Sequence, residues 1–311
     1  MWILILLLVG CGPTERLDAR VSALGMFEHL EALQEIADDH EGNRAAFTEG
    51  YDASVAYVTE RLELAGYTVT HHPFTLRHPG TGEEVTQVNV VAEAESGPAD
   101  RVIHLGAPLD SAPEGPGING GGSGAALVLE IAIQWAGMEL EPENRLRFTW
   151  WGAEAPGQVG SGSWIQEHEL PMAYLHFDAV GSPNGMPFVY DGVGALGAYD
   201  PPAGAGAIEG LFAEWFRRAG IPHGGVDPRR PADAQRFFEA GVPVGGLYAG
   251  GPELKSAEEA AVFGGIANAP YDPCHDQPCD HLGNLDPFLF DILGAAAAHV
   301  TQELALWGED L

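Results

Sequence analysis

The sequence predicts an α/β fold, with a mixed, largely parallel sheet and helices on both faces. Segments with the pattern of strands alternate with segments with the pattern of helices, which is the arrangement that gives parallel sheets. Several strand patterns are apolar throughout, as expected for strands buried on both faces. Neither an internal repeat nor a linker is recognisable, so we expect a single domain.

Two helical patterns open the domain. Apolar residues recur every three positions over 23–37, and a second helix over 45–65 is ended by Gly66. Alternating and then continuous apolar runs predict three strands, at 67–70, 88–94 and 101–106. A glycine-rich turn over 115–124 then opens a helix that runs through residues 127–135.

The second half continues this alternation. Leu146–Trp151 is a clean strand pattern, a helix is expected near 163–168, and 174–180 is a further buried strand. Residues 192–206 are rich in Gly, Ala and Pro and predict a loop. The remaining predicted elements are a helix, a strand and a closing helix, at 207–219, 242–247 and 287–307.

The charge of the chain excludes one class of partner. Its 311 residues include 14 basic and 45 acidic side chains, which give a formal net charge of −31. Nucleic-acid binding needs clustered Lys and Arg on one surface, so we expect no nucleic-acid partner. We interpret the acidic excess as a well-solvated surface.

The amino-terminal residues predict export. Residues 2–9 are all apolar, a run too short to span a bilayer, and Leu8-Val9-Gly10-Cys11 resembles a bacterial lipobox. We expect a signal peptide at 1–10, a tether at 11–24 after a lipidated Cys11, and the domain at 25–311. The expected location is the bacterial cell envelope, on the periplasmic side or the cell surface, with membrane contact through the anchor only. An ordinary cleaved signal is the alternative.

The other two cysteines, Cys274 and Cys279, would meet an oxidising compartment after export, and we expect them to pair. The glycine-rich turn also contains the spacing G-x-G-x-x-G at Gly115, Gly117 and Gly120. Several residues separate this motif from the preceding strand, and no acidic residue closes a second strand at the distance a dinucleotide site needs. We therefore interpret the turn as a wide loop that needs positive φ at several positions.

Five blocks, in order and with similar gaps, resemble the M28 zinc aminopeptidases. The resemblance extends over about residues 45–306, and its blocks are Gly106–Gly124, Trp150–Ser161, Phe177–Pro183, Gly241–Leu247 and Tyr271–Asp280. It implies a single α/β domain that binds two zinc ions. Five protein ligands hold these ions, and one carboxylate and one water molecule bridge them. It also implies a Glu that acts as general base on that water.

Compared with this pattern, most metal ligands of the family are replaced. Pro108 stands at the position of a ligand His, Gly120 at the bridging Asp and Ala155 at a ligand Glu, and none of these side chains can coordinate a metal. The resemblance retains Glu154 as the general base, which we expect to be idle, and Asp178 as a ligand. Asp110 is retained as the orienting residue behind the ligands.

The last block is altered as well. Asp276 stands at the position of the second ligand His, with His275 beside it. A family block Arg-Ser-Asp-His corresponds to residues 231–234, where the arginine and the histidine are missing. His104 lies too far along its strand to replace a ligand, and we interpret it as a packed histidine.

These replacements lead to a functional expectation. We expect no cofactor, or at most one altered metal site that includes Asp178, Asp276 and His275. The favoured function is non-catalytic binding of a peptide amino terminus or an envelope protein, because Glu154, Asp110 and Asp178 form an acidic pocket. The alternatives are a metallo-aminopeptidase or other hydrolase with an altered or single-metal site, and a structural envelope lipoprotein.

Overall fold

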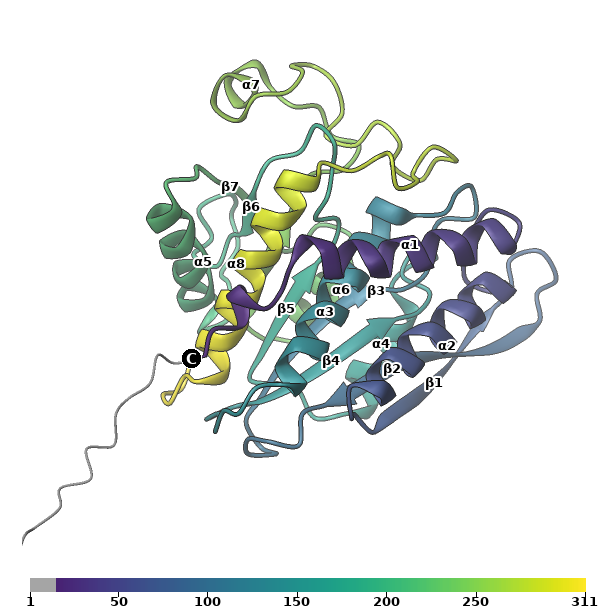
Figure 1. Cartoon of the computed structure of the whole chain (residues 1–311), viewed down its shortest axis with the longest axis horizontal. Helices are drawn as coiled ribbons and strands as arrows, with labels where there is room; N and C mark the ends of the chain where they lie inside the picture. The colour runs from purple at the N-terminus through teal and green to yellow at the C-terminus, as the bar shows by residue number, and fades with distance from the viewer. Residues whose placement is uncertain (1–14) are drawn as a thin grey trace, which may run out of the picture.

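A sheet of eight strands runs through the computed structural model, which describes residues 15–311 (Figure 1). The strands are β1 (Val69–Arg77), β2 (Glu84–Glu93), β3 (Val102–Pro108), β4 (Arg145–Trp151), β5 (Ala173–Phe177), β6 (Phe188–Tyr190), β7 (Gly224–Val226) and β8 (Val244–Tyr248). Their order across the sheet is β1-β2-β4-β3-β5-β8-β6-β7. The pairs β4–β3, β3–β5, β5–β8 and β6–β7 are parallel, and the other three are antiparallel. The predicted fold class is confirmed.

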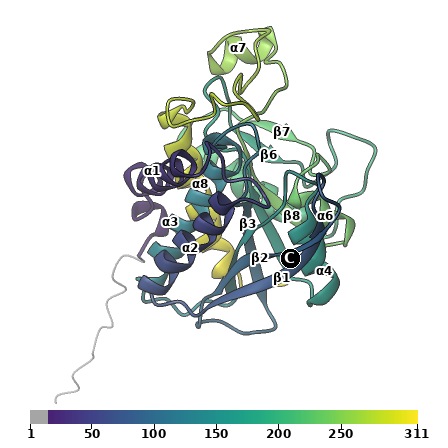
Figure 2. The same cartoon turned by 90° about the vertical axis from the view of Figure 1, so that its right-hand side faces the viewer.

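Helices cover both faces of the sheet, as expected. They are α1 (Ala23–Asp39), α2 (Glu49–Leu64), α3 (Gly124–Ala136), α4 (Val159–Glu167), α5 (Ala205–Ala219), α6 (Asp233–Glu239), α7 (Ala257–Phe263) and α8 (Pro287–Ala305). One face carries α1, α2, α3, α5 and α8, and the other carries α4 and α6 (Figures 1 and 2). The short α7 buries none of its residues and lies in a lobe that projects from the body of the molecule.

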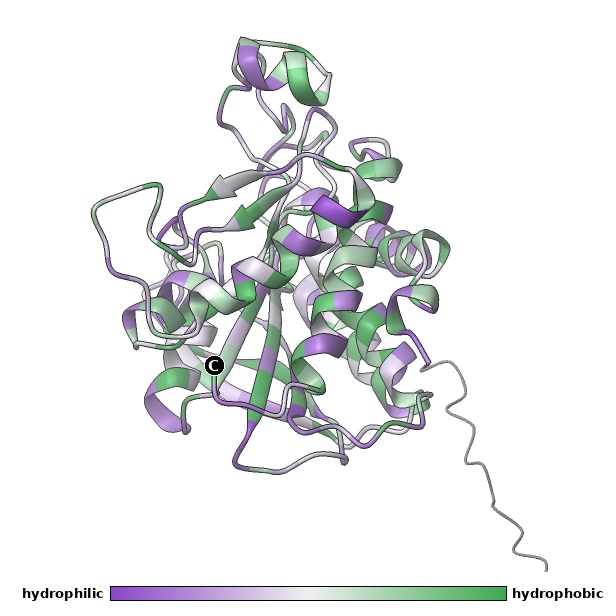
Figure 3. Cartoon of the chain, turned by 90° about the vertical axis from the view of Figure 1, so that its left-hand side faces the viewer, coloured by the Kyte–Doolittle hydropathy of each residue, from purple (hydrophilic) through white to green (hydrophobic). Residues whose placement is uncertain are grey.

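Two apolar cores hold these layers together. The larger core joins the sheet to five helices through buried side chains such as Leu105, Phe148 and Leu127. The smaller core lies under α4 and α6 and includes Trp151 and Trp164. Figure 3 shows the hydrophobic residues concentrated in the central strands and on the inner parts of the helices. Burial of these residues is the main stabilising contribution to the fold.

The two first helices follow the sequence prediction, with one difference at a boundary. α1 begins after Ser22, whose hydroxyl accepts a hydrogen bond from Gly25 N (3.1 Å). α2 begins at Glu49 rather than at residue 45, because Thr48 is its N-cap and Ala45 forms a parallel bridge with Ser111. The residues before the helix therefore bind the chain to the end of β3.

The edge hairpin is longer than the sequence predicts. A strand is expected at 67–70 only, whereas β1 continues to Arg77 and pairs with β2 along its whole length. Pro73 argues against a central strand, but β1 is an edge strand, where a missing N–H is tolerated. The very short elements β6, β7, α6 and α7 were not predicted, because a few residues show no periodicity.

Part of the segment expected to be a tether is packed against the domain. Leu17 is buried, and its N–H donates to Gln302 Oε1 of α8 (2.7 Å). The expected signal peptide and Cys11 lie outside the described residues. Within residues 15–311, no helix has the length and apolar character that crossing a membrane requires.

The predicted disulfide between Cys274 and Cys279 is confirmed. The two cysteines are separated by 5 positions, so the bridge closes a short loop of the unfolded chain. From the entropy of that loop, replacing both cysteines by serine is expected to lower the free energy of unfolding by about 2 kcal/mol. Urea denaturation of the two proteins measures the difference. Equal unfolding midpoints would contradict this expectation.

Candidate functional site

Three predicted acidic residues meet at one edge of the sheet. β3, β4 and β5 are parallel neighbours, so their carboxyl ends lie at the same edge. Asp110 follows β3, Glu154 follows β4 and Asp178 comes directly after β5. Ligand sites of open α/β sheets collect at this edge. We therefore take it as the candidate site.

Asp110 orients the loop that carries Glu154. The Asp110 carboxylate is almost fully buried and accepts hydrogen bonds from Glu154 N (2.9 Å) and Ala155 N (3.2 Å). Burial raises the pKa of Asp110 to about 6, although these hydrogen bonds and the positive charge of Arg44 act in the opposite direction. The retained Asp110 thus fixes the backbone of residues 154 and 155.

The glycine-rich turn is held by a buried arginine that sequence reasoning missed. Arg44 is fully buried, and its guanidinium donates to the carbonyl oxygens of Leu109, Pro116 (3.1 Å) and Gly117 (2.9 Å). The expected positive φ occurs at Gly117 (61°) and at Gly121 (76°). Arg44 lies far upstream of the matching blocks, and no local signal distinguishes it from other charged residues.

The same turn binds the two other parts of the site. Gly121 N donates to Asp178 Oδ1 (3.0 Å), which fixes that carboxylate. Asn119 N and Gly120 N donate to the carboxylate of Asp280 (2.8 and 3.0 Å), so the segment with the disulfide is attached to the turn. A Cβ atom at Gly120 would lie 3.3 Å from Asp280 Oδ2, which leaves little free space at this position.

The positions predicted to have lost their metal ligands lie around these carboxylates. Pro108 ends β3, Gly120 lies in the turn and Ala155 follows Glu154. His275 Nε2 lies 3.4 Å from Asp276 Oδ2, and both charges are close enough to Asp178 to affect its pKa. Even so, no group of three or more His, Cys, Asp or Glu residues within 15–311 could hold a metal ion.

His104 is the packed histidine that the sequence predicts. Its ring is fully buried between aromatic side chains of the smaller core, and Nε2 lies 2.7 Å from Thr149 Oγ1. Burial lowers its pKa well below the usual value. It takes no part in the candidate site.

Carboxylates crowd the centre of the site, as expected. Burial, followed by the negative charges of Asp233, Asp178 and Asp110, raises the pKa of Glu154 well above its usual value. Asp233 is fully buried, and its Oδ1 accepts a hydrogen bond from Ser161 Oγ (2.5 Å). Burial also raises the pKa values of Asp233 and Asp178. Such a site favours a cation in its centre.

An arginine from just before the block at residues 231–234 enters this site. Arg230 lies one position before the block, its guanidinium lies 3.9 Å from the centre of the Tyr248 ring, and Nη1 donates to the carbonyl oxygen of Asp178 (3.2 Å). Its charge lowers the pKa of Glu154 and of Asp178. The sequence feature that could have indicated an arginine in the site is the pair Arg229-Arg230, directly before residue 231.

Neutralising Glu154 is expected to stabilise the fold at high pH. The folded state raises the pKa of Glu154, so it binds more protons than the unfolded state, and stability is lost as the pH rises through this window. Glu154→Gln should therefore raise the free energy of unfolding at pH 8, and raise it by less at pH 4. Urea denaturation at both pH values measures this. Glu60→Gln, on the exposed side of α2, is the control, and a loss of stability of Glu154→Gln at pH 8 would contradict the expectation.

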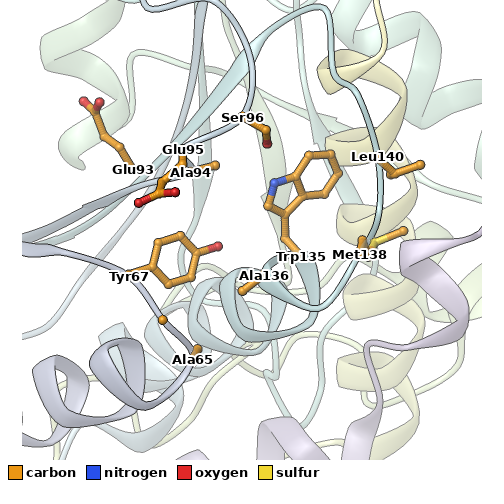
Figure 4. A pocket seen from close by; sticks show the side chains of 11 residues that line it. Ala65, Tyr67, Glu93, Ala94, Glu95, Ser96, Trp135, Ala136, Met138 and Leu140 are labelled. Atoms are coloured by element: carbon orange, nitrogen blue, oxygen red, sulfur yellow. The ribbon is translucent and has the colours of Figure 1, made fainter.

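A small cavity lies at the opposite edge of the parallel strands. Its volume is about 220 Å³, and Tyr67 and Trp135 are among its lining residues (Figure 4). The cavity lies beside Glu93, which pairs with Arg147 near the start of β4. It is therefore separate from the site around Glu154, which lies after the end of β4.

Comparison with known proteins gives consistent matches. Residues 89–301 match Peptidase family M28. An aminopeptidase of Pseudomonas aeruginosa is 42% identical over 223 residues, which are 70% of this chain and 41% of that protein. Leupeptin-inactivating enzyme 1 of Streptomyces exfoliatus is 36% identical over 90% of this chain and 60% of its own length. The "Probable lipoprotein aminopeptidase LpqL" of Mycobacterium tuberculosis is 36% identical over 77% and 49%. The chain thus spans about half the length of the curated relatives that it matches.

Solved structures agree on the fold. An aminopeptidase from Aneurinibacillus sp. strain AM-1 superposes with a TM-score of 0.73 at 16% identity, over 95% of this chain and 97% of that one. A Zn-dependent exopeptidase from Parabacteroides distasonis gives a TM-score of 0.68 at 18% identity, over 91% and 98%. At these identities the likeness shows the fold alone.

The expectation that no cofactor is needed is contradicted by these comparisons. The chain matches Peptidase family M28, and the resemblance described above implies zinc for that family, so zinc is the metal to consider for this chain. The side chains at Pro108, Gly120 and Ala155 do not fit that metal, because none of them carries a donor atom.

Proposed function

The chain belongs to Peptidase family M28, and on this premise we propose that it binds the amino-terminal end of peptides without hydrolysing them. One observation carries the proposal. Glu154, Asp178 and Asp233 gather at the site, and within residues 15–311 none of them has an ion-pair partner within 4.0 Å. Meanwhile Pro108, Gly120 and Ala155 offer no side-chain donor where the resemblance places metal ligands.

The chemistry of these carboxylates suits an ammonium group. Buried charges are unfavourable unless an opposite charge compensates them, and this site concentrates negative charge. The α-ammonium group of a peptide can supply that compensation, and the carboxylates would fix the amino terminus. Hydrolysis needs an activated water as well, and Glu154 alone does not supply one.

The proposed setting is the bacterial cell envelope. The lipobox-like Leu8–Cys11 segment, the disulfide and the relative named as a lipoprotein support export with a lipid anchor at Cys11. We keep a signal peptide (1–10) and a lipidated Cys11 as part of this proposal, but the peptidase-like domain begins before residue 25, because Leu17 is buried and bonded to α8. The partners would be peptides or an envelope protein, with no nucleic acid and with membrane contact through the anchor only.

The test compares the affinities of the chain for a peptide with a free amino terminus and for the same peptide with an acetylated amino terminus. Isothermal titration calorimetry with Leu-Gly-Gly and with N-acetyl-Leu-Gly-Gly, each with and without added zinc, is expected to show at least tenfold weaker binding of the acetylated peptide. Asp178→Asn and Glu154→Gln should weaken Leu-Gly-Gly about tenfold each, which corresponds to about 1.4 kcal/mol. The exposed Glu60→Gln should not. Affinity that is unchanged by Asp178→Asn would overturn the proposal.

A metal-dependent aminopeptidase with an altered site is the second candidate. Its support is that Glu154 and Asp178 lie in one site, that the family points to zinc and that several relatives are named aminopeptidases. Hydrolysis of leucine p-nitroanilide with added zinc separates the two candidates. Turnover that disappears in Glu154→Gln would favour the enzyme.

A further inference from the structure

Arg230 is a half-buried cation without an ion pair. Its guanidinium is half-buried against the Tyr248 ring and donates to a carbonyl oxygen, that of Asp178. Among residues 15–311, no carboxylate oxygen lies within 4.0 Å of its nitrogen atoms. Buried charges are normally paired, and a guanidinium has five N–H donors suited to a carboxylate. The guanidinium can therefore bind an anionic group of a ligand through its N–H donors.

The surroundings of Arg230 add a second unpaired polar group. The Tyr190 hydroxyl is fully buried and has no partner with hydrogen-bond geometry within the described residues. Burial raises its pKa to about 12, and the neighbouring guanidinium of Arg230 acts in the opposite direction. Tyr248 OH is engaged, since it donates to Glu253 Oε2 (3.1 Å). Arg230 and Tyr190 thus form a donor pair at one side of the site.

The unpaired carboxylates lie on the other side. Glu154 and Asp178 are close enough to Arg230 for its charge to lower their pKa values, yet neither forms an ion pair with it. The site therefore holds one positive and several negative groups close together, without an ion pair between them. A ligand with an ammonium group and a carboxylate at short spacing would compensate both kinds of charge at once.

We propose that the site selects a zwitterionic ligand, a free α-amino acid or a dipeptide, whose carboxylate binds Arg230 and Tyr190 and whose ammonium group binds Glu154 and Asp178. This inference rests on the proposed function and names its ligand class. In a longer peptide the carboxylate lies beyond reach of Arg230, and only the ammonium contacts remain. Arg230 is then the residue that determines specificity for short ligands.

The experiment titrates ligands that lack one charge each. Calorimetry with L-leucine, Leu-Leu, L-leucinamide and 4-methylpentanoate uses the wild-type chain first. We expect L-leucine or Leu-Leu, whichever matches the spacing of the site, to bind at least tenfold more tightly than leucinamide, which lacks the carboxylate, and 4-methylpentanoate, which lacks the ammonium group.

Variants then test the role of Arg230. Arg230→Gln should reduce the affinity for the zwitterion to that for leucinamide, without weakening leucinamide itself, a change in selectivity that loss of structural support would not produce. Arg229→Gln is the matched control, because Arg229 is the exposed neighbour paired with Asp227 (2.7 Å), and it should keep the wild-type preference. If Arg230→Gln does not fold, Arg230→Lys is expected to retain the charge and part of the preference.

The outcomes distinguish the two proposals. If leucinamide and Leu-Gly-Gly bind the wild-type chain as tightly as the zwitterions, selection through Arg230 is wrong and recognition of the amino terminus stands. Equal weakening of all ligands by Arg230→Gln also overturns the selection. If no ligand of the panel binds, and Leu-Gly-Gly does not bind either, both proposals fail.

Discussion

Replacing Pro108, Gly120, Ala155 and Asp276 together by His, Asp, Glu and His is expected to raise the affinity of the chain for zinc on the order of 100-fold or more. The four new side chains would join Asp178 at the edge of the sheet where Asp110 and Asp280 already fix the backbone. Side-chain donors are the element that the resemblance finds missing, whereas the scaffold that would orient them is present.

The measurement is competition with a zinc chelator of known affinity, with circular dichroism to verify folding. At Gly120 the Cβ atom of the new side chain would lie 3.3 Å from Asp280 Oδ2, so the Asp280 carboxylate has to shift slightly. Adding Asp178→Asn to the four replacements is the control and should remove most of the gain. A folded fourfold variant that binds zinc no better than the parent chain would show that the positions are wrongly assigned.

Arg44→Met is expected to lower the free energy of unfolding by about 3 kcal/mol or more. The substitution keeps much of the side-chain volume, but it leaves the buried carbonyl oxygens of Leu109 and Pro116 without their donor, whereas that of Gly117 keeps the bond from Gly122 N (3.0 Å). These carbonyls belong to the end of β3 and to the glycine-rich turn, so the site should loosen together with the fold. Binding of Leu-Gly-Gly is expected to weaken as well.

Urea denaturation compares Arg44→Met with Arg61→Met, which removes an exposed arginine of α2 and should change stability by less than about 0.5 kcal/mol. Arg44→Lys keeps the charge but not the fork of donors, and it should lie between the two. A loss below about 1 kcal/mol in Arg44→Met would mean that water or neighbouring groups replace the guanidinium.

The sequence predicts those parts of the fold that have a periodic pattern or a matching motif. The buried β3, β4 and β5 and the long helices α1 and α8 follow from hydrophobic periodicity, and the positions of Glu154 and Asp178 follow from the strand ends. The end of β1 could not be predicted, because the residues from His71 to Pro73 interrupt the apolar pattern and only the pairing with β2 makes a strand of them.

Arg44 and Arg230 could not be predicted as site residues, and the reason is the same for both. Arg44 and Arg230 are charged side chains that become buried only through contacts with distant segments, at Gly117 and Asp178. No local pattern distinguishes them from solvated arginines, and the alignment placed Pro231 at the position where the family has an arginine. Arg230 lies one residue before that position, so a comparison of single positions does not find it.

The most direct test of the central claim follows leucine p-nitroanilide and Leu-Gly-Gly with the same preparation of the wild-type chain, with zinc supplied. We predict binding of Leu-Gly-Gly by calorimetry, no release of free leucine from it, and no release of nitroaniline above that of zinc in buffer. Release of nitroaniline by the wild-type chain that is lost in Glu154→Gln would contradict the account, and would show that an enzyme works at this site.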